Sequence, residues 1–339
     1  MSQKHTTILG IESSCDDTSA AIISGVKIVS NCVSTQKVHQ KYGGVVPELA
    51  SRAHQELIVP VVEEALSEAK MTLEDIDAIA VTRGPGLMGS LVVGVSFAKA
   101  LALAINKPLI DVNHMKAHIL AHFIEDHNTN RPQFPFLCLT VSGGHTQIVE
   151  VQSPYDMKVI GTTIDDAAGE AFDKAAKMIG IDYPGGPELD RIAEEGNPDQ
   201  FSFSKPRIAE LDFSFSGLKT SILYNIRDWV KEDPDFISKN KIDLCASIRK
   251  SIVDILISKI NLASKKTGII NLAIAGGVSA NRELRRRLSM MEQEGFKVHV
   301  PKFEYCTDNA AMIAIAGKFS YDKGAFASQD IAADPRLKW

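Results

Sequence analysis

The chain has 339 residues, of which 45% are hydrophobic and 23% charged, and its net charge is −5. A chain of this length exceeds what one hydrophobic core usually supports, so we expect two lobes. The acidic balance excludes a protein that binds nucleic acid through its bulk charge, so such binding would need a local basic patch or a partner protein.

The cysteines and the apolar runs indicate the compartment. Cys15, Cys32, Cys138, Cys245 and Cys306 are scattered and form no CxxC pair. This pattern argues against a disulfide framework or a thiolate zinc site and favours a reducing compartment. The N-terminus does not have the pattern of a signal peptide, and no apolar run reaches transmembrane length. We therefore expect a cytoplasmic protein that does not associate with membranes.

The chain opens with a predicted hairpin, whose strands are residues 6–10 and 20–24. The turn between them is rich in hydroxyls and carboxylates, which are common in turns for conformational reasons alone. However, Glu12, Asp16 and Asp17 would repel one another, which favours a cation or a phosphate–metal complex nearby. Both interpretations remain open at this point.

The next elements alternate between helix and strand. An apolar stripe predicts a helix over residues 47–70, with a kink or a break at Pro60. A strand at 76–82 and a glycine-rich turn at 83–90 precede a helix ending near 105. The glycine spacing fits neither a Walker A loop nor a dinucleotide fingerprint, so it predicts close approach of strand and helix.

Two histidines then begin a predicted helix. Residues 108–112 are typical of a buried strand, Asn113 is a good N-cap, and the helical pattern runs to Phe123. His114 and His118 are four residues apart, which places their Cβ atoms roughly 5–6 Å from each other on one helix face. This spacing suits one metal ion, although histidines on a helix face are often plain surface or packing residues.

The second half repeats the opening hairpin. A polar, proline-broken stretch at 125–135 is the best candidate for an interdomain linker. Strands at 136–141 and 147–151 follow, joined by a turn of small residues, so the repeat predicts two similar lobes that close on a cleft. A third unit, the strand 269–275 with a glycine turn and a helix over 281–291, could bind an anion or a nucleotide through its backbone amides.

The residues between these units have a different character. A helix is expected after residues 162–174, and a rigid turn at 183–190 precedes another helix. Asp173 and Asp190 could each be an ordinary helix-surface carboxylate.

Charged residues near the end of the chain allow two interpretations. The arginines 282, 285, 286 and 287 could form a solvated helix face or bind phosphate. Residues 301–305 are expected to be extended, and Asp308 to be the N-cap of a helix over 310–319. Asp308 could also complete a metal site with His114 and His118.

Together these pieces resemble the family of tRNA N6-adenosine threonylcarbamoyltransferases, formerly described as O-sialoglycoprotein endopeptidases. The similar stretches run in family order across nearly the whole chain and are residues 10–18, 47–52, 83–87, 114–118, 141–146, 183–187, 215–219, 276–281 and 307–309. One departure is Asp17, where glutamate is frequent in the family.

The resemblance implies an α/β protein with the actin-like ATPase (ASKHA) fold. This fold has two lobes, each with a mixed β-sheet flanked by helices, and a nucleotide cleft between them. The N-terminal lobe would comprise residues 1–130 and about 309–339. The C-terminal lobe would comprise residues 131–308, with a helical insertion at about 162–245.

The resemblance also implies a set of site residues. One divalent metal ion, Fe²⁺ or alternatively Zn²⁺, would be held by His114, His118 and Asp308. The adenylate part of the substrate, or ATP or ADP, would be held by Asp173, Gly186, Asp190 and Asn281. The phosphate and carbamoyl part would lie against the turn formed by Thr140, Val141, Ser142, Gly143 and Gly144. From the residues themselves, we expect Glu12 or Asp16 to accept the proton from N6.

The implied reaction transfers a threonylcarbamoyl group from threonylcarbamoyl-AMP to N6 of adenosine 37, in tRNAs that read codons beginning with A, and releases AMP. A metal ion and glycine-turn amides would stabilise the charge that develops on the carbonyl and phosphate oxygens. In a bacterial protein the resemblance further implies two partners, an inactive paralogue and a small ATPase.

Three other functions compete with this one. A zincin metallopeptidase needs a glutamate directly after the first histidine, and this position is Met115. A sugar kinase or another ATPase of this fold would have no use for a two-histidine site. A non-enzymatic, nucleotide-gated scaffold would not depend on His114.

Overall fold

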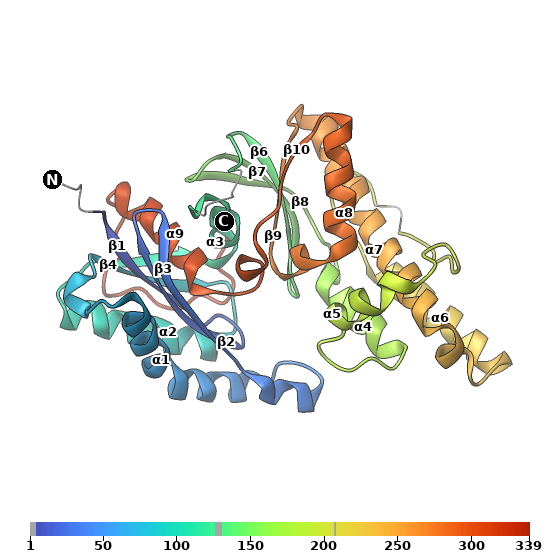
Figure 1. Ribbon diagram of the computed structural model, residues 1–339, viewed down its shortest axis with the longest axis horizontal. Helices are drawn as coiled ribbons and strands as arrows, with labels where there is room; N and C mark the ends of the chain where they lie inside the picture. The colour runs from blue at the N-terminus through green and yellow to red at the C-terminus, as the bar shows by residue number, and fades with distance from the viewer. Residues whose placement is uncertain (1–4, 126–130, 207) are drawn as a thin grey trace. The chain divides into compact units, whose positions relative to one another are not determined.

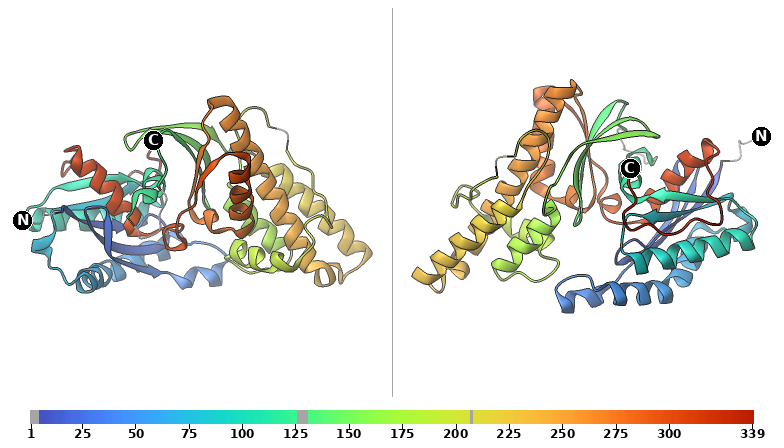
Figure 2. Two further views of the ribbon diagram at one scale, coloured as in Figure 1. Left: turned by 45° about the horizontal axis from the view of Figure 1, so that its top comes forward. Right: turned by 180° about the vertical axis from the view of Figure 1, so that it is seen from behind.

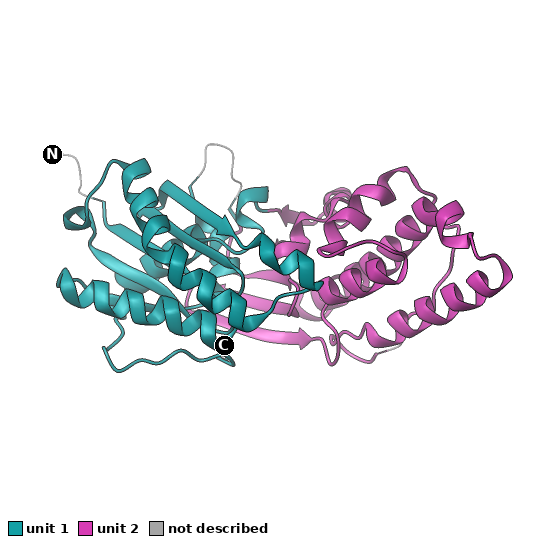
Figure 3. Cartoon of the chain, turned by 90° about the horizontal axis from the view of Figure 1, so that it is seen from below, with its two compact units in different colours: residues 1–131, 301–339 teal, residues 132–300 magenta. Residues whose placement is uncertain are grey.

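The computed structural model describes residues 5–125, 131–206 and 208–339 (Figure 1). The chain forms two compact units, coloured separately in Figure 3: unit 1 is residues 1–131 with 301–339, and unit 2 is residues 132–300. The chain thus returns to unit 1 at Pro301, ahead of the expected position 309. The division into functional lobes stays a prediction, and part of the expected linker, residues 126–130, lies outside the described residues.

Unit 1 is built on a five-stranded mixed sheet in the order β3-β2-β1-β4-β5. The first three strands are antiparallel, with Glu12 opposite Ser19, whereas β1, β4 and β5 are parallel. The predicted opening hairpin is therefore confirmed. The strands are β1 Thr7–Glu12, β2 Asp17–Ser24, β3 Lys27–Thr35, β4 Ala78–Gly84 and β5 Leu109–Asn113.

Helices cover both faces of this sheet (Figure 2). Helices α1 and α2 pack on one face through a core that includes Leu9, Ile11 and Ile22. Helix α9 packs on the other face, so close to β1 that a Cβ on Gly10 would lie 2.5 Å from the carbonyl oxygen of Ala310. The helices are α1 Pro47–Ala69, α2 Met88–Ala104, α3 His114–Leu120 and α9 Ala310–Asp322, with 3-10 turns at Lys37–Tyr42, Leu73–Asp75, Ala121–Phe123 and Phe303–Tyr305.

Unit 2 repeats this strand order, β10-β9-β6-β7-β8, with an antiparallel β6–β7–β8 hairpin and parallel β9 and β10. The internal repeat predicted from the two hairpins is thus present in the topology. The strands are β6 Phe136–Val141, β7 Thr146–Ser153, β8 Asp156–Thr162, β9 Asn271–Ala275 and β10 Lys297–His299. The helices are α4 Ala168–Met178, α5 Gly185–Ile192, α6 Ser216–Glu232, α7 Phe236–Thr267 and α8 Arg282–Met291, with 3-10 turns at Ala193–Glu195, Gly277–Ala280 and Glu292–Glu294.

Several local expectations were wrong or incomplete. Pro60 does not divide its helix, because it lies on the exposed side while Ile58 and Val61 are buried against the sheet. Residues 301–305 were expected to be extended, but residues 303–305 form a 3-10 turn that buries Tyr305. The strands β3, β8 and β10 were not predicted. No helix in the described part of the chain combines the length and the apolar character needed to cross a bilayer.

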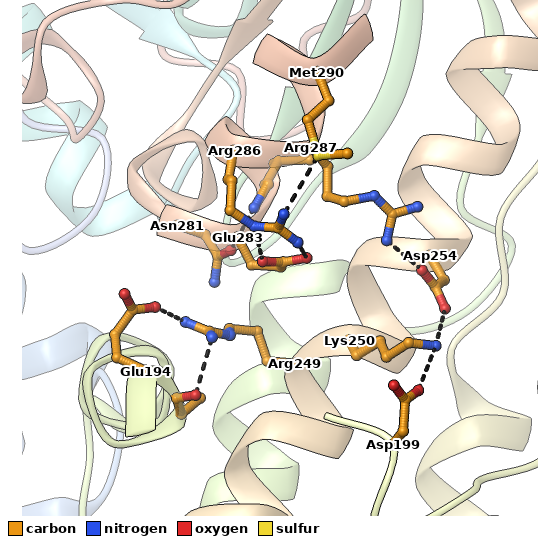
Figure 4. A network of polar contacts seen from close by, with 12 residues as sticks. Glu194, Asp199, Arg249, Lys250, Asp254, Asn281, Glu283, Arg286, Arg287 and Met290 are labelled. Atoms are coloured by element: carbon orange, nitrogen blue, oxygen red, sulfur yellow. Dashed lines mark hydrogen bonds and ion pairs between the residues drawn. The ribbon is translucent and has the colours of Figure 1, made fainter. Parts of the chain in front are cut away.

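A polar network joins the long helix α7 to its neighbours in unit 2 (Figure 4). The carboxylate of Asp254 is 2.7 Å from Lys205 Nζ, 3.1 Å from Lys250 Nζ and 2.8 Å from Arg287 Nη1. Burial acts to raise the pKa of Asp254, but hydrogen bonds from the three cations outweigh burial and lower the pKa to about 2. The network therefore ties α8 and the segment around Lys205 to α7.

We expect Asp254→Asn to lower the free energy of unfolding by about 1–2 kcal/mol at pH 7, because three cations lose their shared partner. The folded pKa lies below the unfolded value, so this contribution is fully present above about pH 4 and is lost as the pH falls toward 2. Urea denaturation of both chains between pH 7 and pH 3 measures the difference. Asp228→Asn, which removes a carboxylate from an exposed ion pair, should change stability by less than about 0.5 kcal/mol. Equal effects of the two substitutions would contradict the prediction.

Candidate functional site

The strand β5 leads directly into the helix that carries the two histidines. The side-chain oxygen of Asn113 accepts hydrogen bonds from the amides of Met115 (3.0 Å) and Lys116 (3.2 Å), so α3 begins at His114. The rings of His114 and His118 are both buried, and their centroids are 4.7 Å apart. The N-cap and the shared helix face predicted from the sequence are therefore confirmed.

Asp308 comes from the other end of the chain to meet both rings. Its Oδ1 is 3.4 Å from His114 Nε2 and 3.2 Å from His118 Nε2. The expectation that Asp308 caps the next helix was wrong, because Asn309 caps α9 by accepting a hydrogen bond from the amide of Met312. The Asp308 carboxylate is thus directed at the histidines, and one ligand atom from each of the three residues lies within 4.8 Å of the others.

The chemistry of these three residues fits a divalent metal ion. Among the described residues, the buried Nδ1 of His118 has no hydrogen-bond partner, and its Nε2 lies 3.2 Å from Asp308 Oδ1. An imidazole buried in this way is costly unless something binds its nitrogen. Two imidazole nitrogens and one carboxylate oxygen are a common donor set for zinc and non-haem iron. The group formed by His114, His118 and Asp308 is therefore a candidate metal site.

The second nitrogen of His114 is held by the end of β1 and the turn that follows it. Glu12, at the end of β1, is fully buried, and its Oε2 is 3.0 Å from His114 Nδ1 and 2.6 Å from Thr82 Oγ1. The other carboxylate oxygen of Glu12 accepts a hydrogen bond from the backbone amide of Ser14. The hydroxyl of Ser14 is 3.2 Å from His114 Nδ1. A carboxylate in this position fixes the ring orientation and leaves Nε2 for a metal. Sequence reasoning missed Thr82 and Ser14, since no local pattern marks them.

The electrostatics of this site favour a positive charge. Burial acts to lower the pKa of His114, but Asp308 and Glu12 outweigh burial and raise the pKa well above its usual value. Burial lowers the pKa of His118 and keeps that ring neutral, the form that binds metals. Burial and the nearby negative charges of Asp308, Asp16 and Glu12 raise the pKa of Asp17 to about 7. Either a proton or a metal ion would relieve this excess of negative charge.

The two predicted proton acceptors differ in accessibility. Glu12 is enclosed by hydrogen bonds and 0% exposed, whereas Asp16 is partly exposed in the turn between β1 and β2. The backbone oxygen of Asp16 accepts the amide of Gln36 at 3.2 Å, which anchors the turn. The catalytic role of either residue stays a prediction.

In unit 2 the four residues expected to hold the adenylate are connected through helix α5. Asp173 Oδ1 accepts the amide of Gly186 at 2.8 Å, in the first turn of α5. One turn later, Asp190 Oδ1 accepts a hydrogen bond of 2.9 Å from Asn281 Nδ2. The other side-chain atom of this asparagine, Oδ1, caps α8. The structure thus brings together residues from three helices that are far apart in sequence.

The turn from Thr140 to Gly144 lies beside the glycine turn that precedes α8. Gly276 has a φ of 86°, and a Cβ there would lie 2.5 Å from the carbonyl oxygen of Val141, so only glycine allows this approach. Thr140 and Val141 are buried at the end of β6, Ser142 is partly buried, and Gly143 and Gly144 are exposed. The two turns predicted to contact phosphate are therefore neighbours in the structure.

The arginine cluster on α8 is engaged mainly within unit 2. Arg286 pairs with Glu283 at 2.7 Å, Arg287 pairs with Asp254, and Arg285 Nε donates to the carbonyl oxygen of Ser279 at 2.7 Å. These contacts favour a structural role of the cluster over phosphate binding.

Sequence reasoning missed Arg249, a buried arginine on α7. Its guanidinium donates to Asp190 Oδ1 at 3.0 Å and also pairs with Glu194 (Figure 4). Together with Asn281, it therefore fixes the position of the Asp190 carboxylate.

Comparison with solved structures supports the fold. The full-length HypF in its phosphate- and nucleotide-bound form superposes with a TM-score of 0.62 at 15% identity, over 96% of this chain and 48% of that chain. Component A of the (R)-2-hydroxyglutaryl-CoA dehydratase of Acidaminococcus fermentans superposes with a TM-score of 0.53 at 16% identity, over 94% of this chain and 99% of that chain. Together with the two mixed sheets, these likenesses confirm the predicted actin-like ATPase fold.

Comparison of sequences gives the family. The family model of tRNA N6-adenosine threonylcarbamoyltransferase matches residues 27–315. The protein of that name from Christiangramia forsetii is 58% identical over 340 residues, covering 100% of both chains. The one from Riemerella anatipestifer is 57% identical over 336 residues, covering 99% of this chain and 98% of the relative. This chain belongs to the tRNA N6-adenosine threonylcarbamoyltransferase family.

Proposed function

We propose that this chain transfers a threonylcarbamoyl group from threonylcarbamoyl-AMP to N6 of adenosine 37, in tRNAs that read codons beginning with A, with release of AMP. Family membership supports the overall reaction. The observation that carries its assignment to particular residues is the buried group of His114, His118 and Asp308, with Glu12 bonded to the far nitrogen of His114.

In this proposal His114 Nε2, His118 Nε2 and Asp308 bind one divalent metal ion, Fe²⁺ first and Zn²⁺ as the alternative. Three protein ligands leave coordination positions open, as catalytic metal sites require. A bound metal would act as a Lewis acid that stabilises negative charge developing on oxygen. Glu12 and Thr82 keep the ring of His114 oriented for this task.

The adenylate part of the donor binds to unit 2 in this proposal. Asp173, Gly186, Asp190 and Asn281 hold the nucleoside. The Thr140–Gly144 turn contacts the phosphate and carbamoyl part. Around Gly143 and Gly144 the described residues leave open space, since a Cβ added to either glycine would meet nothing within 4 Å. Backbone amides in such a turn are good donors to an anion.

Asp16 is the proposed acceptor of the proton from N6. It is partly exposed, whereas Glu12 has both carboxylate oxygens engaged in hydrogen bonds. We therefore assign Glu12 to positioning His114. The acceptor substrate is tRNA, and because the chain is acidic with its α8 arginines largely paired, we propose that helper subunits assist tRNA binding. For a bacterial protein, the family resemblance implies that these helpers are an inactive paralogue and a small ATPase.

The alternatives fit this site less well. A metallopeptidase of the zincin type would need a glutamate general base at position 115, where the chain has Met115. A sugar kinase would bind magnesium through carboxylates and substrate phosphates and would not need two buried imidazoles.

Loss of a metal ligand should abolish transfer. We expect His118→Ala to lower the incorporation of labelled threonine into tRNA by more than about 100-fold, because one of the three metal ligands is removed. The assay combines labelled threonine, bicarbonate, ATP, the adenylate-forming enzyme, tRNA and the helper subunits. His122→Ala removes a buried histidine one turn further along that is outside the metal group and should retain transfer. A His118→Ala chain that stays folded and active would refute the metal role.

Glu12→Gln should lower the affinity for Zn²⁺ by about 10–100-fold, because the amide no longer fixes the His114 ring as a carboxylate does. Competition with a chelating dye measures this affinity. Glu48→Gln, which removes an exposed negative charge from the same unit, should leave the affinity unchanged. Equal affinities of the wild-type and Glu12→Gln chains would contradict the positioning role.

Metal binding should release about one proton at pH 7. The raised pKa of His114 means that the ion-free ring is protonated there, and the metal must displace this proton. The affinity should therefore fall about tenfold for each unit of pH below neutrality. Titration calorimetry in two buffers with different ionisation enthalpies counts the released protons. A binding enthalpy that is the same in both buffers would show that no proton is released.

Asp16→Asn should slow transfer by about 10²–10⁴-fold while Zn²⁺ affinity and stability are retained, because a general base is lost but no ligand is. The matched variant is Asp17→Asn at the neighbouring carboxylate. If Asp17→Asn rather than Asp16→Asn shows the large loss, the base has been assigned to the wrong residue.

A further inference from the structure

We infer that residues 331–338, called here the strap, position the metal-binding helix α3. This inference rests on the metal site proposed above. After α9 the chain crosses back over unit 1, where the amide of Ala327 donates to the carbonyl oxygen of Leu109 at 2.8 Å. Two cations then hold the start of the strap: Lys99 Nζ donates to the carbonyl oxygen of Ile331 at 3.0 Å, and Arg83 Nε to that of Ala332 at 3.1 Å.

The middle of the strap is bonded to the end of β4 and to the loop that follows it. The amide of Asp334 donates to the carbonyl oxygen of Arg83 at 2.9 Å, and the amide of Gly86 donates to that of Pro335 at 3.3 Å. A Cβ on Gly84 would lie 1.8 Å from the carbonyl oxygen of Asp334. The strap can therefore follow this path only because residue 84 has no side chain.

The end of the strap reaches the cap of α3. Asn113 Nδ2 donates to the carbonyl oxygen of Lys338 at 3.1 Å, while Asn113 Oδ1 accepts the first amides of α3. One side-chain amide thus joins the strap to the helix that carries His114 and His118. Holding this amide in one rotamer keeps its oxygen aimed at the helix.

The strap also supports the other side of His114 through the loop after β4. The amide of Leu87 in this loop donates to the carbonyl oxygen of Ser14 at 2.7 Å, and Ser14 Oγ is 3.2 Å from His114 Nδ1. A Cβ on Gly86 would lie 2.5 Å from the carbonyl oxygen of Ser14, so the loop after β4 is in close contact with the turn after β1. Displacing the strap would therefore disturb both the cap of α3 and the hydroxyl beside its first histidine.

The strap is held by hydrogen bonds of its backbone carbonyls and amides, with Ile331 and Ala333 partly buried against the core of unit 1, and all its residues are partly or fully exposed. Segments with little buried apolar surface open at low free-energy cost. If an ordered strap favours metal binding, linkage requires that metal binding favours an ordered strap by the same factor. The strap is thus a positioning element whose order is coupled to the metal.

The first test measures Zn²⁺ affinity in three variants. Asn113→Ser keeps a side-chain oxygen that can cap α3 but loses the amide that donates to the carbonyl oxygen of Lys338. Gly84→Ala displaces the strap, because the added Cβ would overlap the carbonyl oxygen of Asp334. We expect both to weaken Zn²⁺ binding at least fivefold, the lower end of typical coupling. Gly324→Ala is the control, because Gly324 also has a positive φ, 69°, but a Cβ added there would meet no described atom within 4 Å. Asn113→Ser and Gly84→Ala chains that fold and bind Zn²⁺ as tightly as the control would overturn the inference.

The second test measures hydrogen exchange of the intact chain with and without Zn²⁺. We expect Zn²⁺ to slow exchange of the Gly86 and Asp334 amides by about fivefold or more in the wild type, the reciprocal of the same coupling, and to have no effect in His118→Ala. If Zn²⁺ binding depends on His118 but does not change the exchange rates of these amides, the role of the strap is refuted and the metal site is not. Zn²⁺ binding that does not depend on His118 refutes the metal site, and the role of the strap with it.

Discussion

The carboxylates of Glu12 and Asp308, on either side of one imidazole, are the constraint on which unit 1 depends. Glu12 meets Nδ1 of His114 and Asp308 meets Nε2. Glu12 is fully buried and Asp308 is partly buried, so two negative charges held this close together are costly without a positive charge between them. Strand β1, strand β4, helix α3 and the residue before the cap of α9 all converge on this ring. The arrangement makes sense if the site holds a cation, and two imidazoles with one carboxylate are a donor set that suits a metal ion.

The two units share a strand order, but the turn of the first hairpin differs between them: it is acidic in unit 1 and made of small residues in unit 2. In unit 1 the turn of the first hairpin carries Asp16 and begins after the buried Glu12. In unit 2 the corresponding turn consists of small residues, among them Gly143 and Gly144, and a second glycine turn at Gly276 approaches its backbone. Carboxylates suit a cation and exposed amides suit an anion. One repeated topology thus provides a turn suited to a cation in one unit and a turn suited to an anion in the other.

Helix α5 organises the proposed nucleotide residues in unit 2. Its first turn donates an amide to Asp173, and Asp190 on its next turn is held by both Asn281 and Arg249. Asp190 is thereby fixed in place by a buried cation that belongs to the long helix α7. The stability of this site therefore depends on the packing of α7, which the ion pairs of Asp254 anchor to its neighbours a little further along the same helix.

The sequence by itself determined the features that depend on local chemistry. Asn113 before an apolar helical run located the start of α3, the spacing of His114 and His118 put both rings on one face, and the duplicated hairpins indicated two related sheets. The ordered motifs also identified the family and its fold.

Only the tertiary structure decided the rest. It showed that Asn309 rather than Asp308 caps α9, that Glu12 is bonded to His114, and that Pro60 is accommodated on an exposed helix face. These outcomes depend on burial and on contacts between residues far apart in the chain, and a local pattern carries no information about which distant group will arrive beside it.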